Sequence, residues 1–313
     1  MGYIPFKQWS LCYNGRIQNP KSSNTYNRFR LKAYLGLHIS VALFGLAGLF
    51  GRWLDLDPLW IVEGRVVFAF LSLALIIRIK GLGFSLDQKS HHLRLILIGA
   101  ILAFHWYAFF RSIQETSIAL ALLSFASFPF WTMLLEAFGQ GQRMGWPQWF
   151  MVLVSFSGTA LIVPWDFGDA NFYGVIWGLA SGLSFALMAI LNKEMVQSYP
   201  ALKLSFFQDF WAALLLLPFC LMLPVALDGK EIALLALLGT LFTALSHSLF
   251  IGALKFVKAR TAALIAALEP VYGIAAAYFL FSERLDLLTL IGGILILGTG
   301  VYAQFKDPAL VED

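Results

Sequence analysis

The side chains with the most evident chemistry in this sequence are charged residues that stand inside long apolar stretches. They are Glu63, Arg65, Asp209 and Glu269. An ionisable group is costly in a membrane-like apolar segment, and where one occurs it usually faces the interior of the protein and serves a function. These four residues are therefore the first candidates for a substrate-binding or coupling site.

Glu269 lies about ten residues into an apolar stretch, so about 15 Å deep at the rise of an α-helix, and Pro270 follows it directly. A proline inside a helix removes a backbone hydrogen bond and frees a carbonyl. A carboxylate beside such a loosened turn could bind an ammonium group or exchange a proton. The alternative is that Glu269 pairs with an arginine and only holds the helices together.

Arg65 follows Glu63 at a spacing of two residues, so the two side chains do not face each other on a helix and each needs another partner. Arg65 could hold a substrate carboxylate with two parallel hydrogen bonds, which arginine does better than lysine. The alternatives for the pair are an interhelical salt bridge or extension of the side chains to the interface at the outer face of the membrane.

His105 and His247 occupy corresponding positions in the two halves of the chain, as the repeat described below shows. If their spans line a shared cavity, both rings face it from opposite sides of the membrane midplane. A histidine changes charge near neutral pH, which suits proton coupling. The alternative is a hydrogen-bonded histidine of the protein core.

Asp209 and two aromatic residues complete the candidate site. Asp209 stands near the inner end of its apolar stretch, where it could line a cytoplasmic vestibule or extend to the membrane surface. Trp106 lies deep in its stretch and could wall the site, stacking on a cation. Tyr272 follows Glu269 on the same stretch and joins it as a candidate.

The composition identifies the elements that must position these residues. Of 313 residues, 59% are hydrophobic and 13% are charged, whereas a soluble domain is about 45–50% apolar and about 25% charged. A disordered protein, a nucleic-acid binder and a conventional soluble enzyme are therefore excluded. About 20 apolar residues cross a bilayer, and irregular backbone in lipid would leave polar groups unpaired.

The sequence thus predicts an all-α membrane protein with ten transmembrane helices. Their predicted ranges are 32–53, 58–79, 93–112, 115–137, 147–165, 172–193, 203–225, 231–254, 259–281 and 285–305.

The positions of Lys and Arg predict the orientation, because cytoplasmic loops carry an excess of both. If the N-terminus is cytoplasmic, most of the 22 Lys and Arg face inward, and the outer loops hold only Arg52, Arg111, Lys230 and Arg284. Both termini are then cytoplasmic. The N-terminal tail, 1–31, is basic and suits contact with anionic lipid headgroups, and a short tail covers 306–313.

The two halves of the chain form an internal repeat. At an offset of 142 residues, Gly36 falls on Gly178, Pro58 on Pro200 and His105 on His247; at 141, Pro129 falls on Pro270 and Gln142-Arg143 on Glu283-Arg284. This order predicts two five-helix units, 32–165 and 166–305. Because five is odd, the second unit crosses the membrane in the opposite sense. Inverted repeats are typical of secondary transporters, whose substrate site lies near the midplane between the repeats.

The segment AALEPVYGIAAAYFLFSERLDLLTLIGGILILGTGVYA, residues 266–303, resembles the closing part of the EamA-type transporters of the drug/metabolite transporter superfamily. AFHWYAFF at 103–110 and FPFWTMLLEAF at 128–138 resemble the first repeat of the same family. The resemblance covers roughly 32–305. One departure is GQGQR at 139–143, which lacks the acid that Glu283 supplies in the second repeat.

The resemblance implies a ten-helix carrier of small metabolites in the bacterial inner membrane, often an exporter of amino acids or related compounds. Carriers of drugs, sugars or nucleobases stay open as alternatives. The expected partners are a small-molecule substrate, with proton coupling open, and the lipid bilayer, with no nucleic acid. The chain could act as a monomer or a homodimer.

Other classes of function find less support. An intramembrane enzyme would need a metal or nucleophile motif, and neither H-E-x-x-H nor G-x-S-x-G occurs in the sequence. A channel usually builds its pore from repeated subunits or polar rings. No nucleotide-binding loop is present, so transport would be driven by a gradient or by an exchanged substrate. No cofactor or metal is expected.

Overall fold

The computed structural model describes residues 23–86, 88–140, 145–163, 169–266 and 268–306. The predicted N-terminal tail falls mostly outside the described residues, as do Gln142-Arg143 and nearly all of the predicted C-terminal tail. The regular elements within the described ranges are helices, in agreement with the predicted fold class.

The first half holds α2 (Ser23–Ala47), α3 (Phe50–Trp53), α4 (Pro58–Ile79), α5 (Lys89–Glu115), α6 (Ile118–Phe125), α7 (Phe128–Gln140) and α8 (Trp146–Ile162). The second half holds α9 (Ala170–Met195), α10 (Ala201–Cys220), α11 (Gly229–Gly239), η1 (Thr240–Leu245), α12 (Ser246–Ala253), α13 (Ala259–Ala266), α14 (Glu269–Phe281) and α15 (Leu287–Lys306).

Among the described residues, seven helical segments are long and apolar enough to cross a membrane. Two shorter apolar helices, Trp149–Ile162 and Leu287–Thr299, correspond to the predicted fifth and tenth spans. The predicted ninth span falls outside this criterion because it is divided between α13 and α14. Helix α4 matches its predicted range at both ends, whereas α2 begins at Ser23, before the predicted start at 32, and α10 ends at Cys220, before the predicted end at 225.

Capping residues define where several helices begin. Asp57 accepts a hydrogen bond from the Leu59 amide just before α4, and Asp169 does the same for Asn171 at the start of α9. Asp228 forms a capping box with Glu231 at the start of α11. Such side chains satisfy amides that have no partner in the first helical turn.

Two spans are broken at corresponding positions of the repeat. In the first half, α6 ends at Phe125 and α7 begins at Phe128, followed by Pro129. In the second half, α13 ends at Ala266 and α14 begins at Glu269, followed by Pro270. Proline suits the first turn of a helix and cannot continue a preceding one, so each Pro starts a new helix in the middle of a span.

Glycines let neighbouring helices pass close to both breaks. A Cβ atom at Gly45 of α2 would lie 2.5 Å from the Glu269 carbonyl oxygen, and one at Gly182 of α9 would lie 2.8 Å from the Phe125 carbonyl oxygen. Neither position therefore accommodates a side chain without movement of the backbone. These contacts fix α2 and α9 against the broken spans.

A π-helical turn, η1, lies between α11 and α12. The Thr243 hydroxyl within it donates to the Leu238 carbonyl, five residues earlier, at 2.8 Å. π-Helical turns are rare and often occur at functional sites, because they rotate the following side chains relative to a regular α-helix.

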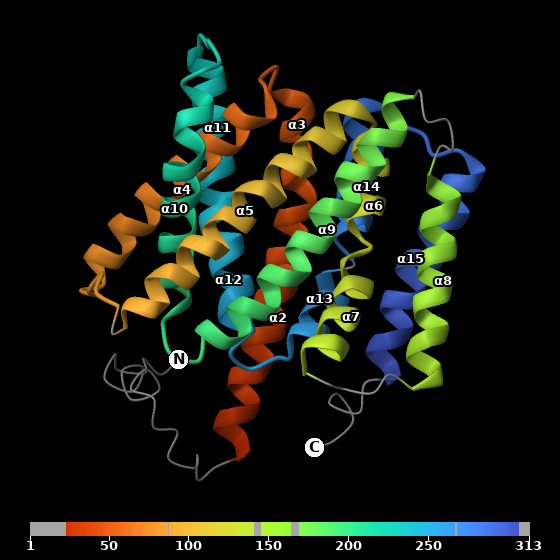
Figure 1. Ribbon diagram of the computed structural model, residues 1–313, viewed down its shortest axis with the longest axis horizontal. Coiled ribbons are helices and arrows are strands. Elements are labelled where there is room, and N and C mark those ends of the chain that lie inside the picture. Colours follow the sequence, from red (N-terminus) through yellow and green to blue (C-terminus); the bar gives the residue numbers. More distant parts are fainter. Residues whose placement is uncertain (1–22, 87, 141–144, 164–168, 267, 307–313) are drawn as a thin grey trace.

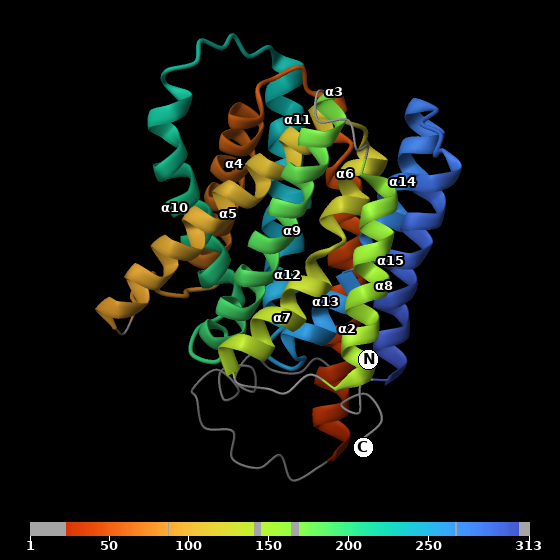
Figure 2. The same ribbon diagram turned by 45° about the vertical axis from the view of Figure 1, so that its right-hand side comes forward.

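Figures 1 and 2 show the arrangement of the helices. The start of α2 and the end of α15 lie at the same end of the molecule, and α9 runs in the opposite direction to α2. Helices α8 and α15 pack against each other at one edge of the bundle. The main hydrophobic core is formed by side chains of α2, α4, α5, α9 and α12 among others, and the candidate site lies within it.

Candidate substrate site between the two halves

A small cavity, with about 20 Å³ of space for water-sized molecules, lies at the centre of the bundle. Both halves of the chain contribute to its wall: α2, α4, α5 and α6 from the first, and α9, α12 and α14 from the second. The lining residues are Phe44, Ala47, Arg65, His105, Trp106, Phe109, Phe125, Phe185, Met188, His247 and Glu269.

Arg65 enters the cavity from α4, and its side chain is only 1% exposed to solvent. Its guanidinium carbon lies 3.8 Å from the centre of the Trp106 ring, and Nε donates to the Thr243 hydroxyl at 3.0 Å. Among the described residues its two terminal nitrogens have no hydrogen-bond partner. A stacked, tethered guanidinium with free donors is well placed to bind a carboxylate.

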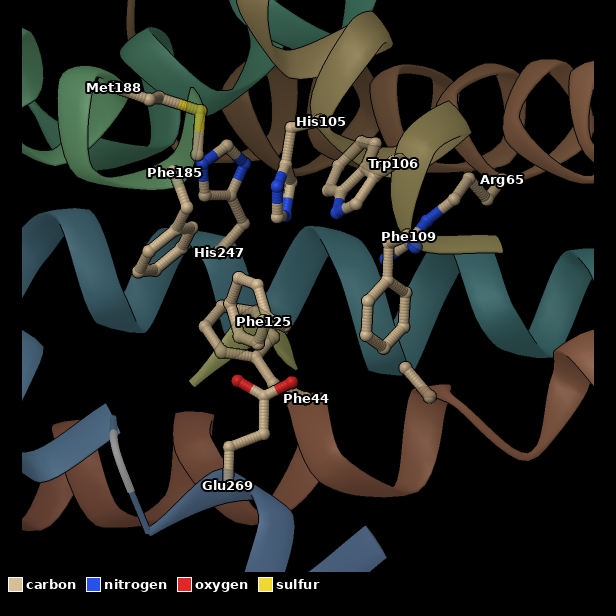
Figure 3. Close-up of a pocket in the computed structure, with 11 residues that line it drawn as sticks. Phe44, Arg65, His105, Trp106, Phe109, Phe125, Phe185, Met188, His247 and Glu269 are labelled. Atoms are coloured by element: carbon tan, nitrogen blue, oxygen red, sulfur yellow. The ribbon is translucent and has the colours of Figure 1, made fainter. Parts of the chain in front are cut away.

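Glu269 reaches the cavity from the opposite wall, as Figure 3 shows. It is the first residue of α14 and is buried, and its Oε2 atom has no hydrogen-bond partner among the described residues. The positive end of the α14 dipole stabilises a carboxylate here. An unpartnered buried carboxylate is costly, so the position suits a group that receives a cation or a proton.

The two histidines line the same cavity but differ in their hydrogen bonds. The Nδ1 atom of His105 lies 3.0 Å from the Ser181 carbonyl oxygen and 2.9 Å from the Ser181 hydroxyl. His247 packs its ring edge-on against Trp106, and neither of its nitrogens has a partner among the described residues. His105 therefore has the contacts of a core histidine, whereas His247 is free to bond a ligand.

Aromatic side chains form much of the remaining wall. Phe125 and Phe185 meet edge to face with ring centres 5.5 Å apart, and Phe44 packs edge-on against Phe185 at 6.4 Å. Rings in this arrangement offer apolar surface and an electron-rich face to a bound cation. Phe44, Phe125 and Phe185 are not among the residues selected from the sequence, because helical periodicity cannot tell which rings face a cavity.

The sequence analysis also missed Thr243, the anchor of Arg65. A threonine in an apolar stretch is unremarkable in sequence. Its side chain faces Arg65 within the π-helical turn, and no sequence pattern announces such a turn.

Three predicted residues do not line the cavity. Tyr272 is 39% exposed and does not contribute to the wall. Glu63 is buried on α4 with Oε2 unpartnered among the described residues. Asp209 is completely buried on α10, so it does not extend to the membrane surface, and it lies outside the cavity lining.

No group of three or more His, Cys, Asp or Glu side chains among the described residues is arranged to hold a metal ion. The polar groups of the cavity are one cation, one carboxylate and two imidazoles, surrounded by apolar surface. This set can recognise an organic molecule that carries both a cationic and an anionic group.

The model of the EamA-like transporter family matches residues 31–163 and 172–302, one match in each half of the chain. The chain belongs to the EamA-like transporter family. This confirms the resemblance seen in the sequence. Together with the long apolar helices, it makes the chain a transporter that is a multi-pass integral protein of the bacterial inner membrane.

Two relatives with curated names extend this comparison. A protein of Archaeoglobus fulgidus named as an uncharacterized transporter is 29% identical over 270 residues, which are 86% of this chain and 94% of the relative. A protein of Rickettsia conorii named S-adenosylmethionine uptake transporter is 26% identical over 240 residues, which are 77% of this chain and 81% of the relative.

A solved crystal structure has the same fold. It superposes with a TM-score of 0.65 and 18% sequence identity, and the match covers 91% of this chain and 98% of the other.

Proposed function

We propose that this transporter is a secondary carrier that binds an amino acid or a related zwitterionic metabolite in the central cavity. The observation that carries the proposal is the pair Arg65 and Glu269, which reach one aromatic cavity from opposite walls. Arg65 would bind the carboxylate of the solute, and Glu269 would bind its ammonium group. His247 would add a hydrogen bond, and Trp106 would hold Arg65 in place.

The chemistry of the wall favours an amino acid with an apolar or aromatic side chain. Phe44, Phe125 and Phe185 offer stacking surface and Met188 a polarisable thioether. S-Adenosylmethionine, after which the Rickettsia conorii relative is named, combines an amino-acid group, a sulfonium cation and an aromatic base. It is therefore the first compound to test, beside amino acids.

For the transport cycle, we propose ten spans with both termini in the cytoplasm, arranged as two inverted units, 32–165 and 166–305. The opposite directions of α2 and α9 support this arrangement. Relative rocking of the two units would expose the cavity to each side in turn.

The direction of net transport would follow the gradients. The family resemblance favours export, whereas the names of the Rickettsia relatives speak of uptake.

The deciding experiment is counterflow in proteoliposomes. Vesicles loaded with unlabelled compound are presented with the labelled compound outside, using S-adenosylmethionine, amino acids, sugars, nucleobases and organic cations in turn. We expect saturable exchange of S-adenosylmethionine or of an amino acid, and loss of exchange in Glu269→Gln.

Exchange restricted to sugars or nucleobases would contradict the zwitterion assignment, and non-saturable flux would contradict a carrier. Glu283→Gln is the matched control, because Glu283 does not line the cavity. Its carboxylate accepts hydrogen bonds from the Ile118 and Ala119 amides, at 3.3 Å each. This variant should retain exchange.

A further inference from the structure

Asp209 is a buried carboxylate that the substrate cavity does not use. It lies on α10 with no exposed surface, and neither of its oxygens has a hydrogen-bond partner among the described residues. Its neighbour Gln208 is equally buried but exchanges two hydrogen bonds with Asn192, at 2.6 and 3.3 Å. Buried polar groups are nearly always hydrogen-bonded, so two unpartnered oxygens on one carboxyl group call for an explanation.

Arg65 is the charged group that connects Asp209 with the cavity. Its positive charge acts on Asp209 and on Glu269, yet it forms no ion pair within 4.0 Å with either. Thr243 holds Arg65 through Nε alone. Arg65 therefore interacts electrostatically with one acid inside the cavity and one acid outside its lining.

The other titratable groups near Asp209 come from the three helices packed against α10. Helix α4 carries Glu63 as well as Arg65, α5 carries His92 and His105, and α12 carries His247. Of these, Arg65 is the group whose charge acts on Asp209. Among these groups, the charge of Arg65 therefore has the main influence on the ionisation of Asp209.

The balance of charge in this buried cluster restricts its states. Arg65 can compensate one ionised carboxylate, and a second uncompensated charge in the core would be very costly. With the cavity empty, one of the two acids must therefore carry a proton. Glu269 has the helix N-terminus and the cavity to stabilise its charge, whereas Asp209 has neither, so Asp209 is the acid that holds the proton.

We propose that Asp209 is a proton-binding site, separate from the substrate cavity, that releases one proton when a solute with a net positive charge binds. The proposal rests on the function proposed above. When such a solute binds, its carboxylate pairs with Arg65 and its ammonium group with Glu269, and its further positive charge is left over. The O–H bond of Asp209 breaks, the proton passes to water, and the carboxylate that remains balances the added charge of the solute.

Charge is conserved in this exchange, since one positive charge enters the protein and one proton leaves it. Return of the proton to Asp209 would leave the added positive charge of the bound solute uncompensated and favour release of the solute. A pH gradient could thus drive transport. A zwitterion with no net charge pairs with Arg65 and Glu269 together, leaves the balance unchanged and releases no proton.

Two probes with the same adenosyl group test this mechanism. S-Adenosylmethionine carries a net charge of about +1 at neutral pH, and S-adenosylhomocysteine, which lacks the sulfonium charge, carries about zero. Each is added to the purified protein in weakly buffered detergent solution with a pH indicator. We expect about one proton released for each S-adenosylmethionine bound and none for S-adenosylhomocysteine. Equal release with both probes would overturn the proposal.

The variant Asp209→Asn locates the proton. Asparagine resembles a protonated aspartate in shape and charge, so the variant should fold. Its binding of S-adenosylmethionine should weaken, because no carboxylate then balances the added charge, whereas its binding of S-adenosylhomocysteine should not change. It should lose proton release and the response of uptake to a pH gradient. Proton release that persists in Asp209→Asn would refute the proposal, whereas loss of counterflow in Glu269→Gln reports on the proposed function alone.

An infrared measurement needs no substrate. The substrate-free protein at neutral pH should show the carbonyl band of a protonated carboxylic acid, and this band should disappear in Asp209→Asn. If the infrared spectra of parent and variant do not differ in this region, Asp209 is ionised and the proposal fails.

Discussion

The two broken spans of this transporter share the position of the break but differ in the side chain that follows it, which is apolar in one and acidic in the other. In α6–α7 the first residue after the break is Phe128, and in α13–α14 it is Glu269; a proline follows each. The same contrast holds for the cation. At the offset of the repeat, Arg65 in the first half corresponds to Phe207 in the second. Each half therefore supplies one charge, and the other half places a phenylalanine at the equivalent position.

This difference shows that the repeat duplicates the backbone path and not the binding groups. Two copies of Glu269, or two copies of Arg65, would place like charges in one buried space, where neither could be compensated. One acid and one base give a cavity whose charges balance and which suits a zwitterion. His105 and His247 are present in both halves because neutral imidazoles carry no such penalty.

The largest effect is expected at Glu269. Replacing it with Gln removes a charge-assisted hydrogen bond to the cationic group of the solute, worth about 1.5–3 kcal/mol, or about 10- to 100-fold in affinity. Phe128→Leu, at the equivalent position of the first half, should change affinity by less than about threefold. Concentration dependence of counterflow measures both. Equal losses of affinity in the two variants would show that only the backbone geometry of the break is required and that the carboxylate has no separate role.

Arg65 should show a somewhat smaller effect when its charge is kept. Arg65→Lys loses the bond to Thr243 and the stacking on Trp106, which for a desolvated cation is worth about 2 kcal/mol. We expect about tenfold weaker binding of zwitterionic solutes, and a much smaller change for Phe207→Leu. Competition against labelled solute gives both values. A lysine variant that binds as tightly as the parent would remove the guanidinium from the binding role.

The two histidines should separate stability from transport. His105→Leu removes the hydrogen bonding of the ring to the Ser181 carbonyl and hydroxyl and should cost about 0.5–1.5 kcal/mol of stability for each bond lost. His247→Leu removes two nitrogens that have no partner among the described residues, so it should leave stability nearly unchanged while weakening substrate binding. Thermal unfolding in detergent and counterflow distinguish the two. A stability loss of the same size in both would contradict the assigned difference.

The smallest effect is expected at the start of α15, the last helix of the second half, whose counterpart in the first half is α8. Asp286 accepts hydrogen bonds from the Thr289 amide at 2.9 Å and hydroxyl at 2.7 Å before α15, whereas α8 follows Gly145, which has no side chain to cap it. Asp286→Ala should cost about 0.5–2 kcal/mol.

The contribution of Asp286 should depend on pH. The Thr289 hydrogen bonds hold the pKa of the Asp286 carboxyl below its usual value. A lowered pKa means that the cap stabilises the folded protein above the pKa of the unfolded chain, about 3.9, and that this contribution is lost as the pH falls toward the folded value. The difference in melting temperature between parent and Asp286→Ala should therefore be full at pH 7 and shrink below about pH 4. A difference that stays constant to pH 3 would contradict the role of the ionised carboxylate.

The sequence by itself determined the class of protein, most of the helix boundaries and the repeat, because apolar length and the spacing of prolines are local properties that a bilayer imposes directly. It also selected Glu269 and Arg65, since charges in apolar spans have few other reasons to be there. It could not show that Trp106 stacks on Arg65 of the same chain, or that Thr243 holds Arg65.

Only the tertiary structure decided which candidates meet. Tyr272 is on the same helix as Glu269 but does not line the cavity. Asp209 is buried outside the cavity lining and interacts electrostatically with Arg65. Sequence spacing tells which side chains share a face of one helix. The rotation of each helix against its neighbours is decided by packing of the whole bundle, including the close approach at Gly45 and the π-helical turn. This rotation selects the side chains that face the cavity.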